Sequence, residues 1–238
     1  MLPLSNILVG LLCCGTMILL LKATDLSRQT QGTMVLGGMT INNTYMFPFI
    51  LTVYGNSGFA DAILFDFGNA LMVSSFTYAL AFRFGEKDYS HREMLLRILR
   101  SPLFWSLLLA TVLAMTGNSL PFALQDTIRP LANMTSPLIL IALGIYFSLQ
   151  LHHLKLVSVI ILMRMVLGLV FGLLVATVLG LEGESFTVVV LCSAAPIGFS
   201  VLALSAMARL DIELASSAVS LSVLIGLLWV PLLIRMIG

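Results

Sequence analysis

The chain has 238 residues, of which 59% are hydrophobic and only 10% are charged, and its formal net charge is +1. Soluble domains carry about 25% charged residues, so this composition excludes an ordinary soluble domain and predicts an integral membrane protein. The lipid bilayer is therefore the first expected partner, and no nucleic-acid partner is expected. The three cysteines lie in apolar runs without disulfide or metal-ligand spacing, and we expect no cofactor and no metal.

Apolar runs divide the chain into membrane spans, each long enough to cross about 30 Å of hydrocarbon. The first run lacks the basic region of a signal peptide and is predicted to be a retained span. Two connections are longer than the others. Residues 84–101 form an amphipathic basic linker, and residues 119–133 contain two prolines and are expected to lie partly along the membrane interface. The eight predicted spans cover residues 4–22, 32–53, 60–83, 102–118, 134–151, 155–180, 186–208 and 213–236.

Positive charge is distributed unevenly between the two sides of these spans. Of the twelve lysines and arginines, nine fall on one side, two (Arg129 and Arg235) on the other, and Arg164 inside a span. The positive-inside rule predicts that the side with nine faces the cytoplasm, so both termini lie outside it. The nine are Lys22, Arg28, Arg83, Lys87, Arg92, Arg97, Arg100, Lys155 and Arg209.

The second and seventh spans contain polar and helix-breaking residues where lipid tolerates them least. The second is expected to break around Asn42 to Pro48, and the seventh around Ala194 to Gly198. The next span begins 16 residues after Asn43 in one case and 16 residues after Pro196 in the other. Spans one to three and six to eight therefore look like two copies of one unit. The copies start an odd number of spans apart and must point in opposite directions through the membrane.

Paired breaks of this kind indicate a transporter's binding site. A broken helix frees backbone N–H and C=O groups, which is tolerable only beside protein or a water-filled cavity, and half-helix N-termini offer partial positive charge to an anion. Ordinary proline kinks are the alternative explanation. We favour a site, with the two breaks crossing near the bilayer midplane to form one small anion pocket.

Four stretches carry a resemblance to a known family. They are "INNTYMFPFILTVYGNSGFADAILFDFGNAL", "AAPIGFSVLALSAMARLDIELASSAVSLSVLIGLLWVPLL", "SPLFWSLLLATVLAMTGNSLP" and "TSPLILIALGIYFSL". In their order and spacing they resemble the auxin efflux carrier family, within the wider bile-acid and arsenite transporter superfamily. Together with the eight predicted transmembrane helices, the resemblance implies an all-α integral membrane protein with an inverted-repeat transporter fold and two crossing broken helices. The chain is then expected to form a single transporter domain over residues 1–238. Its repeat units would cover residues 1–84 and 155–238, and its scaffold helices residues 102–151.

The resemblance also implies a function. Family members move small organic anions such as malate, malonate or auxin by an elevator motion of a crossover domain against a scaffold. The crossover asparagine of the family falls on Asn43, with Asn42 as the alternative, and the crossover proline on Pro196. We expect a carrier in a bacterial inner membrane, with proton coupling and a homodimer as further candidates, and no enzymatic activity. The expected substrate-binding residues are Asn42, Asn43, Tyr45, Pro48, Asp66, Asn69, Ser193, Pro196, Gly198 and Ser200.

The chain departs from the family pattern in the number of spans. The family has ten, as five plus five, and this sequence begins where the third would. A misplaced start codon, a shortened natural form, or a partner that supplies the missing surface would each account for the difference. A relic or scaffold subunit that does not transport is therefore an alternative function.

Other polar residues inside the spans have more than one interpretation. Asp66 and Asn69 share a helix face, and Asp66 either lines the pathway, where it is a candidate for proton coupling, or is solvated at the interface. Arg164 is expected to snorkel to the cytoplasmic interface; substrate contact and a salt bridge inside the bundle are its alternatives.

The stretch "GNSG" at residues 55–58 supplies a hypothesis from another class, because it matches the GxSG of rhomboid intramembrane proteases. Such an enzyme needs a histidine beside Ser57. His91, His152 and His153 map to the cytoplasmic side and Ser57 to the outer loop, so a flexible turn is the preferred interpretation.

Overall fold

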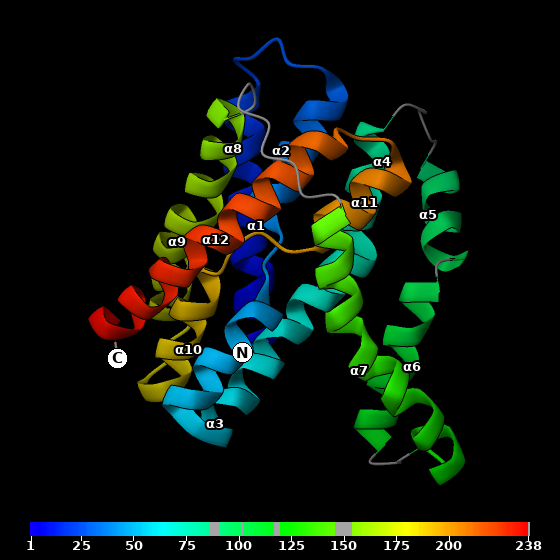
Figure 1. Cartoon of the computed structure of the whole chain (residues 1–238), viewed down its shortest axis with the longest axis vertical. Coiled ribbons are helices and arrows are strands. Elements are labelled where there is room, and N and C mark those ends of the chain that lie inside the picture. Colours follow the sequence, from blue (N-terminus) through cyan, green and yellow to red (C-terminus); the bar gives the residue numbers. More distant parts are fainter. Residues whose placement is uncertain (86–90, 101, 117–119, 146–153, 238) are drawn as a thin grey trace.

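The computed structural model describes residues 1–85, 91–100, 102–116, 120–145 and 154–237. Every regular element in these ranges is a helix (Figure 1). The elements are α1 (Leu2–Leu21), α2 (Arg28–Met39), α3 (Asn43–Met72), η1 (Val73–Thr77), α4 (Tyr78–Phe84), α5 (His91–Arg100), α6 (Pro102–Thr116), α7 (Phe122–Ile145), α8 (Leu154–Ile161), η3 (Leu162–Leu167), α9 (Gly168–Val178), α10 (Gly183–Ser193), α11 (Ser200–Ala208) and α12 (Ile212–Ile237).

Four helical stretches among the described residues are long and apolar enough to cross a membrane: Leu2–Leu21, Asn43–Phe84, Leu154–Val178 and Ile212–Ile237. Together with the helical content, they confirm an all-α membrane protein with several spans. The number of eight spans and the inverted repeat stay predictions.

The first break lies earlier than the sequence predicted. Helix α2 ends at Met39, residues 40–42 are not helical, and α3 begins at Asn43, so Pro48 lies inside α3. The expected break over Asn42 to Pro48 was therefore wrong in its extent. The reason is that Asn42 is the N-cap of α3: its side-chain oxygen accepts a hydrogen bond from the Tyr45 N–H at 3.2 Å. Much of the polar cluster starts a helix instead of interrupting one.

A single glycine reverses the chain after the first half of α3. Gly55 has φ +66° and ψ −158°, inside a stretch that is otherwise helical on both sides. Only glycine adopts this backbone conformation readily, because it has no Cβ. The turn separates the half-helix that follows the break from the long segment that continues through η1 and α4 to Phe84.

The second unit has its break where it was expected. Helices α8, η3 and α9 form one continuous span over Leu154–Val178, followed by α10, which ends at Ser193. Residues 194–199 are not helical, and α11 restarts at Ser200. Arg209 then turns the chain with φ 54° into α12.

The two breaks touch each other at the centre of the bundle. The Asn42 N–H donates to the Pro196 carbonyl at 3.0 Å, and the Gly198 N–H donates to the Thr40 carbonyl at 3.2 Å. Between these bonds, Ile41 and Ile197 form an isolated antiparallel bridge. Backbone groups freed by one break are thus partly satisfied by the other, which is how a non-helical segment can exist inside a membrane protein.

Separate apolar clusters lie on the two sides of this crossing. One contains Met34 and Leu36 from α2 together with Val201 and Leu204 from α11. The other contains Met46 and Ile50 from α3 together with residues 188–192 of α10. Each cluster therefore anchors one half-helix from each break, and the polar crossing lies between the two clusters.

The region after α4 differs from the sequence prediction in one respect. Helix α7 is continuous over Phe122–Ile145, so residues 122–133 continue into the fifth predicted span as one helix, and Pro130 lies inside it. Membrane helices accommodate prolines that would end a soluble helix. The expected position of residues 119–133 partly along the interface stays a prediction. Residues 146–151 of that predicted span lie outside the described residues.

Basic residues flank helix ends at one end of the molecule. The C-terminal ends of α1, α4 and α11 and the N-terminal ends of α2 and α8 lie together at the top of Figure 1, while both termini lie in the opposite half. These ends carry or adjoin Lys22, Arg83, Arg209, Arg28 and Lys155.

Carboxylates tie the two units together at both ends. At the basic end, Asp211 accepts a hydrogen bond from the Thr30 hydroxyl at 3.0 Å. At the other end, Asp61 of α3 accepts a hydrogen bond from the hydroxyl of Ser185 near the start of α10. Each half of the fold therefore holds the beginning of the other half's broken helix.

Candidate functional site at the crossing of the broken helices

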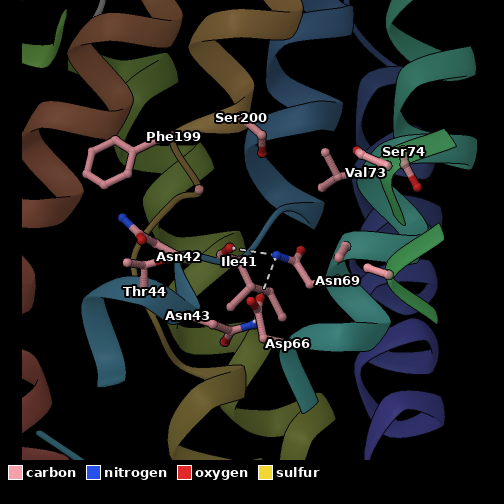
Figure 2. A pocket seen from close by; sticks show the side chains of 14 residues that line it. Ile41, Asn42, Asn43, Thr44, Asp66, Asn69, Val73, Ser74, Phe199 and Ser200 are labelled. Atoms are coloured by element: carbon pink, nitrogen blue, oxygen red, sulfur yellow. Dashed lines mark hydrogen bonds between the residues drawn. The ribbon is translucent and has the colours of Figure 1, made fainter. Parts of the chain in front are cut away.

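A pocket of about 460 Å³ opens beside the crossing. Its walls come from both breaks, from the second segment of α3, from η1 and from α6 (Figure 2). The lining residues are Ile41, Asn42, Asn43, Thr44, Asp66, Asn69, Ala70, Val73, Ser74, Ser106, Ala110, Gly198, Phe199 and Ser200.

Two amides converge on one carboxylate in this pocket. The side-chain amide of Asn43 donates to Oδ1 of Asp66 at 2.8 Å, and the amide of Asn69 donates to the same oxygen at 3.1 Å. Asn69 also donates to the Ile41 carbonyl at 3.3 Å, which ties the carboxylate to the break itself (Figure 2). Hydrogen bonds to a charged acceptor are about twice as strong as neutral ones, so this cluster fixes the side-chain orientations.

Amide groups in the same pocket are left without a partner. Asn42 and Asn43 are buried, with 3% and 1% of their surface exposed. The Asn42 Nδ2 and the Asn43 Oδ1 have no hydrogen-bond partner among the described residues. Figure 2 shows Asn42 pointing away from Asp66, so the free donor and the carboxylate lie on different sides of the pocket. Buried amides without hydrogen-bond partners lower the stability of the fold unless a ligand or water supplies those hydrogen bonds.

The backbone adds partial positive charge. Helix α3 begins at Asn43 and α11 begins at Ser200, and both residues line the pocket. Helix N-termini carry free N–H groups and about half a positive charge each. A carboxylate ligand could be held by these groups and the Asn42 amide without a lysine in the pocket lining.

Six of the ten residues predicted from the sequence line this pocket, and four do not. Tyr45 donates its hydroxyl to the Val223 carbonyl of α12 at 3.4 Å, and Pro48 is exposed on α3. Ser193 lies against Gly172 of α9. Pro196 contributes its carbonyl to the crossing and packs on α12. The six lining residues are Asn42, Asn43, Asp66, Asn69, Gly198 and Ser200.

Several lining residues were missed by sequence reasoning. Thr44 follows the paired asparagines directly and could have been included with them. Ser74, Ser106 and Phe199 carry no signal of their own, because only the packing of η1, α6 and the second break brings them to the pocket.

Arg164 does not lie where the sequence predicted. Its side chain is completely buried, at 0% exposure, in η3, so the expected snorkelling to the interface was wrong. The guanidinium donates to the Ser193 carbonyl at the end of α10 and approaches the Cys13 sulfur at 3.9 Å. The cause is the end of α10, which supplies an acceptor inside the bundle.

The protease hypothesis gains no geometric support. Ser57 is exposed and follows the Gly55 turn within α3. His152 and His153 lie outside the described residues.

Comparisons with known proteins agree with this architecture. A family model described as membrane transport protein matches residues 89–234, more than half of the chain. A protein described as an uncharacterized transporter from Methanothermobacter thermautotrophicus is 26% identical over 209 residues, covering 87% of this chain and 68% of that relative. Both matches confirm the resemblance found in the sequence and support a small-molecule transporter. The chain belongs to the membrane transport protein family that includes the auxin efflux carriers.

Proposed function

We propose that this protein is a secondary transporter of small organic anions, with its binding site in the pocket at the crossing. The observation that carries the proposal is the contact between the two breaks, Asn42 N–H to the Pro196 carbonyl at 3.0 Å, beside a pocket with unpartnered buried amides. Discontinuous helices that meet in this way are typical of transporter sites.

The size and chemistry of the pocket favour small carboxylates. Its volume of about 460 Å³ admits a malate- or malonate-sized ion or an auxin-like weak acid. The N-termini of α3 and α11 and the free Asn42 amide would bind one carboxylate group. Partial charges hold an anion more weakly than a buried lysine would, which allows release on the other side of the membrane.

Asp66 gives a physical route to proton coupling. An ionised Asp66 occupies the amide donors of Asn43 and Asn69 and repels an incoming carboxylate. Protonation removes the repulsion and weakens these hydrogen bonds, so the amides become available to the substrate. Proton and anion would therefore bind together.

The packing supports the proposal of an elevator mechanism. The breaks are bonded to each other and anchored in two apolar clusters, so they are suited to move as one body. Helices α6 and α7 stand beside this body in Figure 1 and would belong to the scaffold. We further propose a bacterial inner membrane, a cytoplasmic basic end, and a homodimer formed through the scaffold.

Uptake of radiolabelled malonate into proteoliposomes tests the proposal. We expect the parent protein to accumulate malonate when an inward proton gradient is imposed. Asn43→Ala should lower uptake at least about tenfold, because a buried hydrogen bond to a charged group contributes roughly 1.5–3 kcal/mol. Asn43→Leu should be at least as inactive despite its greater hydrophobicity.

Asn56→Ala is the matched control, since Asn56 is an exposed amide of the same helix. It should transport like the parent. If both Asn43 variants transported normally, Asn43 would be a packing residue and Asn42 the candidate. A folded parent that moved no anion from a panel of mono- and dicarboxylates would favour the relic or scaffold function instead.

A further inference from the structure

Arg164 is a buried cation that lies outside the lining of the binding pocket. We propose that it is an electrostatic positioning residue: its charge offsets the negative end of α10 and so makes the potential at the crossing more favourable to anions. The inference rests on the proposed function only in that the substrate is an anion. Nothing in it requires Arg164 to touch the substrate.

The first step is that the charge is present. Arginine is effectively always protonated in proteins. Among the described residues Arg164 forms no ion pair: its guanidinium contacts the Ser193 carbonyl and the Cys13 sulfur, and its Nε has no partner. A full positive charge therefore sits inside the bundle, where burial without a carboxylate is costly.

The second step concerns the helix ends that meet at the crossing. Helices α3 and α11 present positive N-termini, and α2 and α10 present negative C-termini. Two positive and two negative ends of about half a charge would nearly cancel, leaving little attraction for an anion.

The third step is that the negative C-termini of α2 and α10 accept hydrogen bonds from groups of different charge. At the end of α2, neutral groups satisfy the carbonyls: the Thr40 hydroxyl donates to the Leu36 carbonyl at 2.7 Å, and the Asn69 amide donates to the Ile41 carbonyl. At the end of α10, the Trp229 indole N–H donates to the Ala194 carbonyl at 3.2 Å, and the Arg164 guanidinium donates to the Ser193 carbonyl. Only the second negative end is compensated by a full charge, so Arg164 makes the potential at the crossing more positive and opposes the negative charge of an ionised Asp66.

The packing shows that space is made for this contact. Gly168 lies directly against the Ser193 carbonyl and the guanidinium, and Gly172 lies against the Ser193 side chain. A Cβ at either glycine would collide with these groups. The α8–η3–α9 span therefore approaches the end of α10 through a glycine face, and the π-helical turn η3 carries the arginine.

A reporter cysteine in the pocket measures the potential without any substrate. Ser200→Cys places a thiol in the lining, and its modification rates are compared for two methanethiosulfonate reagents, the anionic sulfonatoethyl and the cationic trimethylammonioethyl compound. The ratio of the two rates cancels the reactivity of the thiol. The chain without the reporter gives the background of the buried native cysteines.

We expect Arg164→Gln to lower the anionic-to-cationic rate ratio at least about fivefold, because the lost unit charge acts with opposite sign on the two reagents. Arg164→Lys should keep the ratio near the parent value, which a purely structural role would not predict. An unchanged ratio in folded Arg164→Gln, or equal losses in the glutamine and lysine variants, would overturn the proposal.

A second pair of variants covers the case in which Arg164→Gln does not fold. Cys13→Asp leaves the arginine in place and sets a carboxylate beside it, and Cys13→Asn is the neutral control. We expect the aspartate alone to lower the ratio; equal ratios in the two variants would contradict the proposal. If the ratio depends on Arg164 and the protein still binds no carboxylate, the proposed substrate fails while the role of Arg164 stands.

Discussion

At the scale of single residues, the site depends on one carboxylate and the amides around it. Asp66 accepts hydrogen bonds from Asn43 and Asn69 through the same oxygen. While Asp66 is ionised, it holds one N–H of the Asn43 amide and one of the Asn69 amide. The side-chain Nδ2 of Asn42, which caps α3, has no hydrogen-bond partner among the described residues.

Replacement of Asp66 by asparagine should uncouple transport from protons. Asp66→Asn keeps an acceptor for the two amides but carries no charge at any pH, so it imitates the protonated carboxylate. We expect malonate uptake by this variant to continue but to lose its acceleration by an inward proton gradient. Proteoliposome flux with and without the gradient measures the difference.

Asp61→Asn is the matched control for that experiment. Asp61 is a carboxylate of the same helical segment, but its partner is Ser185, outside the pocket. It should remain sensitive to the gradient. A proton-driven Asp66→Asn variant would assign the coupling to another group.

At the scale of elements, backbone hydrogen bonds hold the two breaks together, and side chains line the pocket beside them. Its hydrogen bonds join Asn42 to Pro196 and Gly198 to Thr40. A Cβ at Gly198 would lie 3.0 Å from the Ile41 carbonyl oxygen. A side chain at this position would therefore crowd the backbone of the first break. Glycine and proline are present in the second break for backbone geometry, and the asparagines in the first break supply the polar groups.

A disulfide across the breaks should form without loss of transport. Ile41 and Ile197 face each other between two backbone hydrogen bonds, a position where antiparallel Cα atoms are about 4.5 Å apart, within the range for a disulfide. We expect Ile41→Cys with Ile197→Cys, in a chain without its native cysteines, to cross-link under mild oxidation. Because the breaks are proposed to move as one body, malonate uptake should be similar in the oxidised and reduced protein.

The single-cysteine variants are the controls and should not respond to oxidation. A pair that never cross-links would contradict the contact between the breaks. A pair that cross-links but stops transport until reduced would mean that the breaks separate during the transport cycle.

At the scale of the whole molecule, the basic residues at the helix ends predict the orientation of the protein in the membrane. The basic flanks of α1, α2, α4, α8 and α11 gather at one end, and both termini lie in the other half (Figure 1). This is the arrangement that the positive-inside rule requires of a chain whose termini are both outside the cytoplasm.

Cysteine labelling from the two sides of the membrane tests the orientation. We expect Asp88→Cys in the basic linker and Thr24→Cys after α1 to react with a membrane-impermeant maleimide only from the cytoplasmic side. Glu182→Cys, an exposed position between α9 and α10, should react only from outside. External labelling at position 88 would overturn the orientation.

Much of this protein could be predicted from local sequence. Hydrophobic runs long enough to cross the bilayer predicted helical spans, and polar residues within two of them predicted the breaks. The family came from the resemblance of four stretches to known carriers. The bounds were less secure, because Asn42, Asn43 and Pro48 serve equally well as a break or as the start of a helix. Only the capping bond to Tyr45 decides that the break ends at Asn42.

The sequence by itself determined that the chain is a helical membrane protein, since composition and the order of apolar and polar segments are local properties, and its resemblance to known carriers indicated the transport family. The tertiary structure decided which polar residues share a pocket: it brings Asp66 and Ser200 together and turns Tyr45 and Ser193 away. It also decided the place of Arg164, because a buried acceptor at the end of α10 exists only when α10 packs against η3. Such contacts form between helices that are far apart in the sequence, so a local sequence pattern cannot predict them.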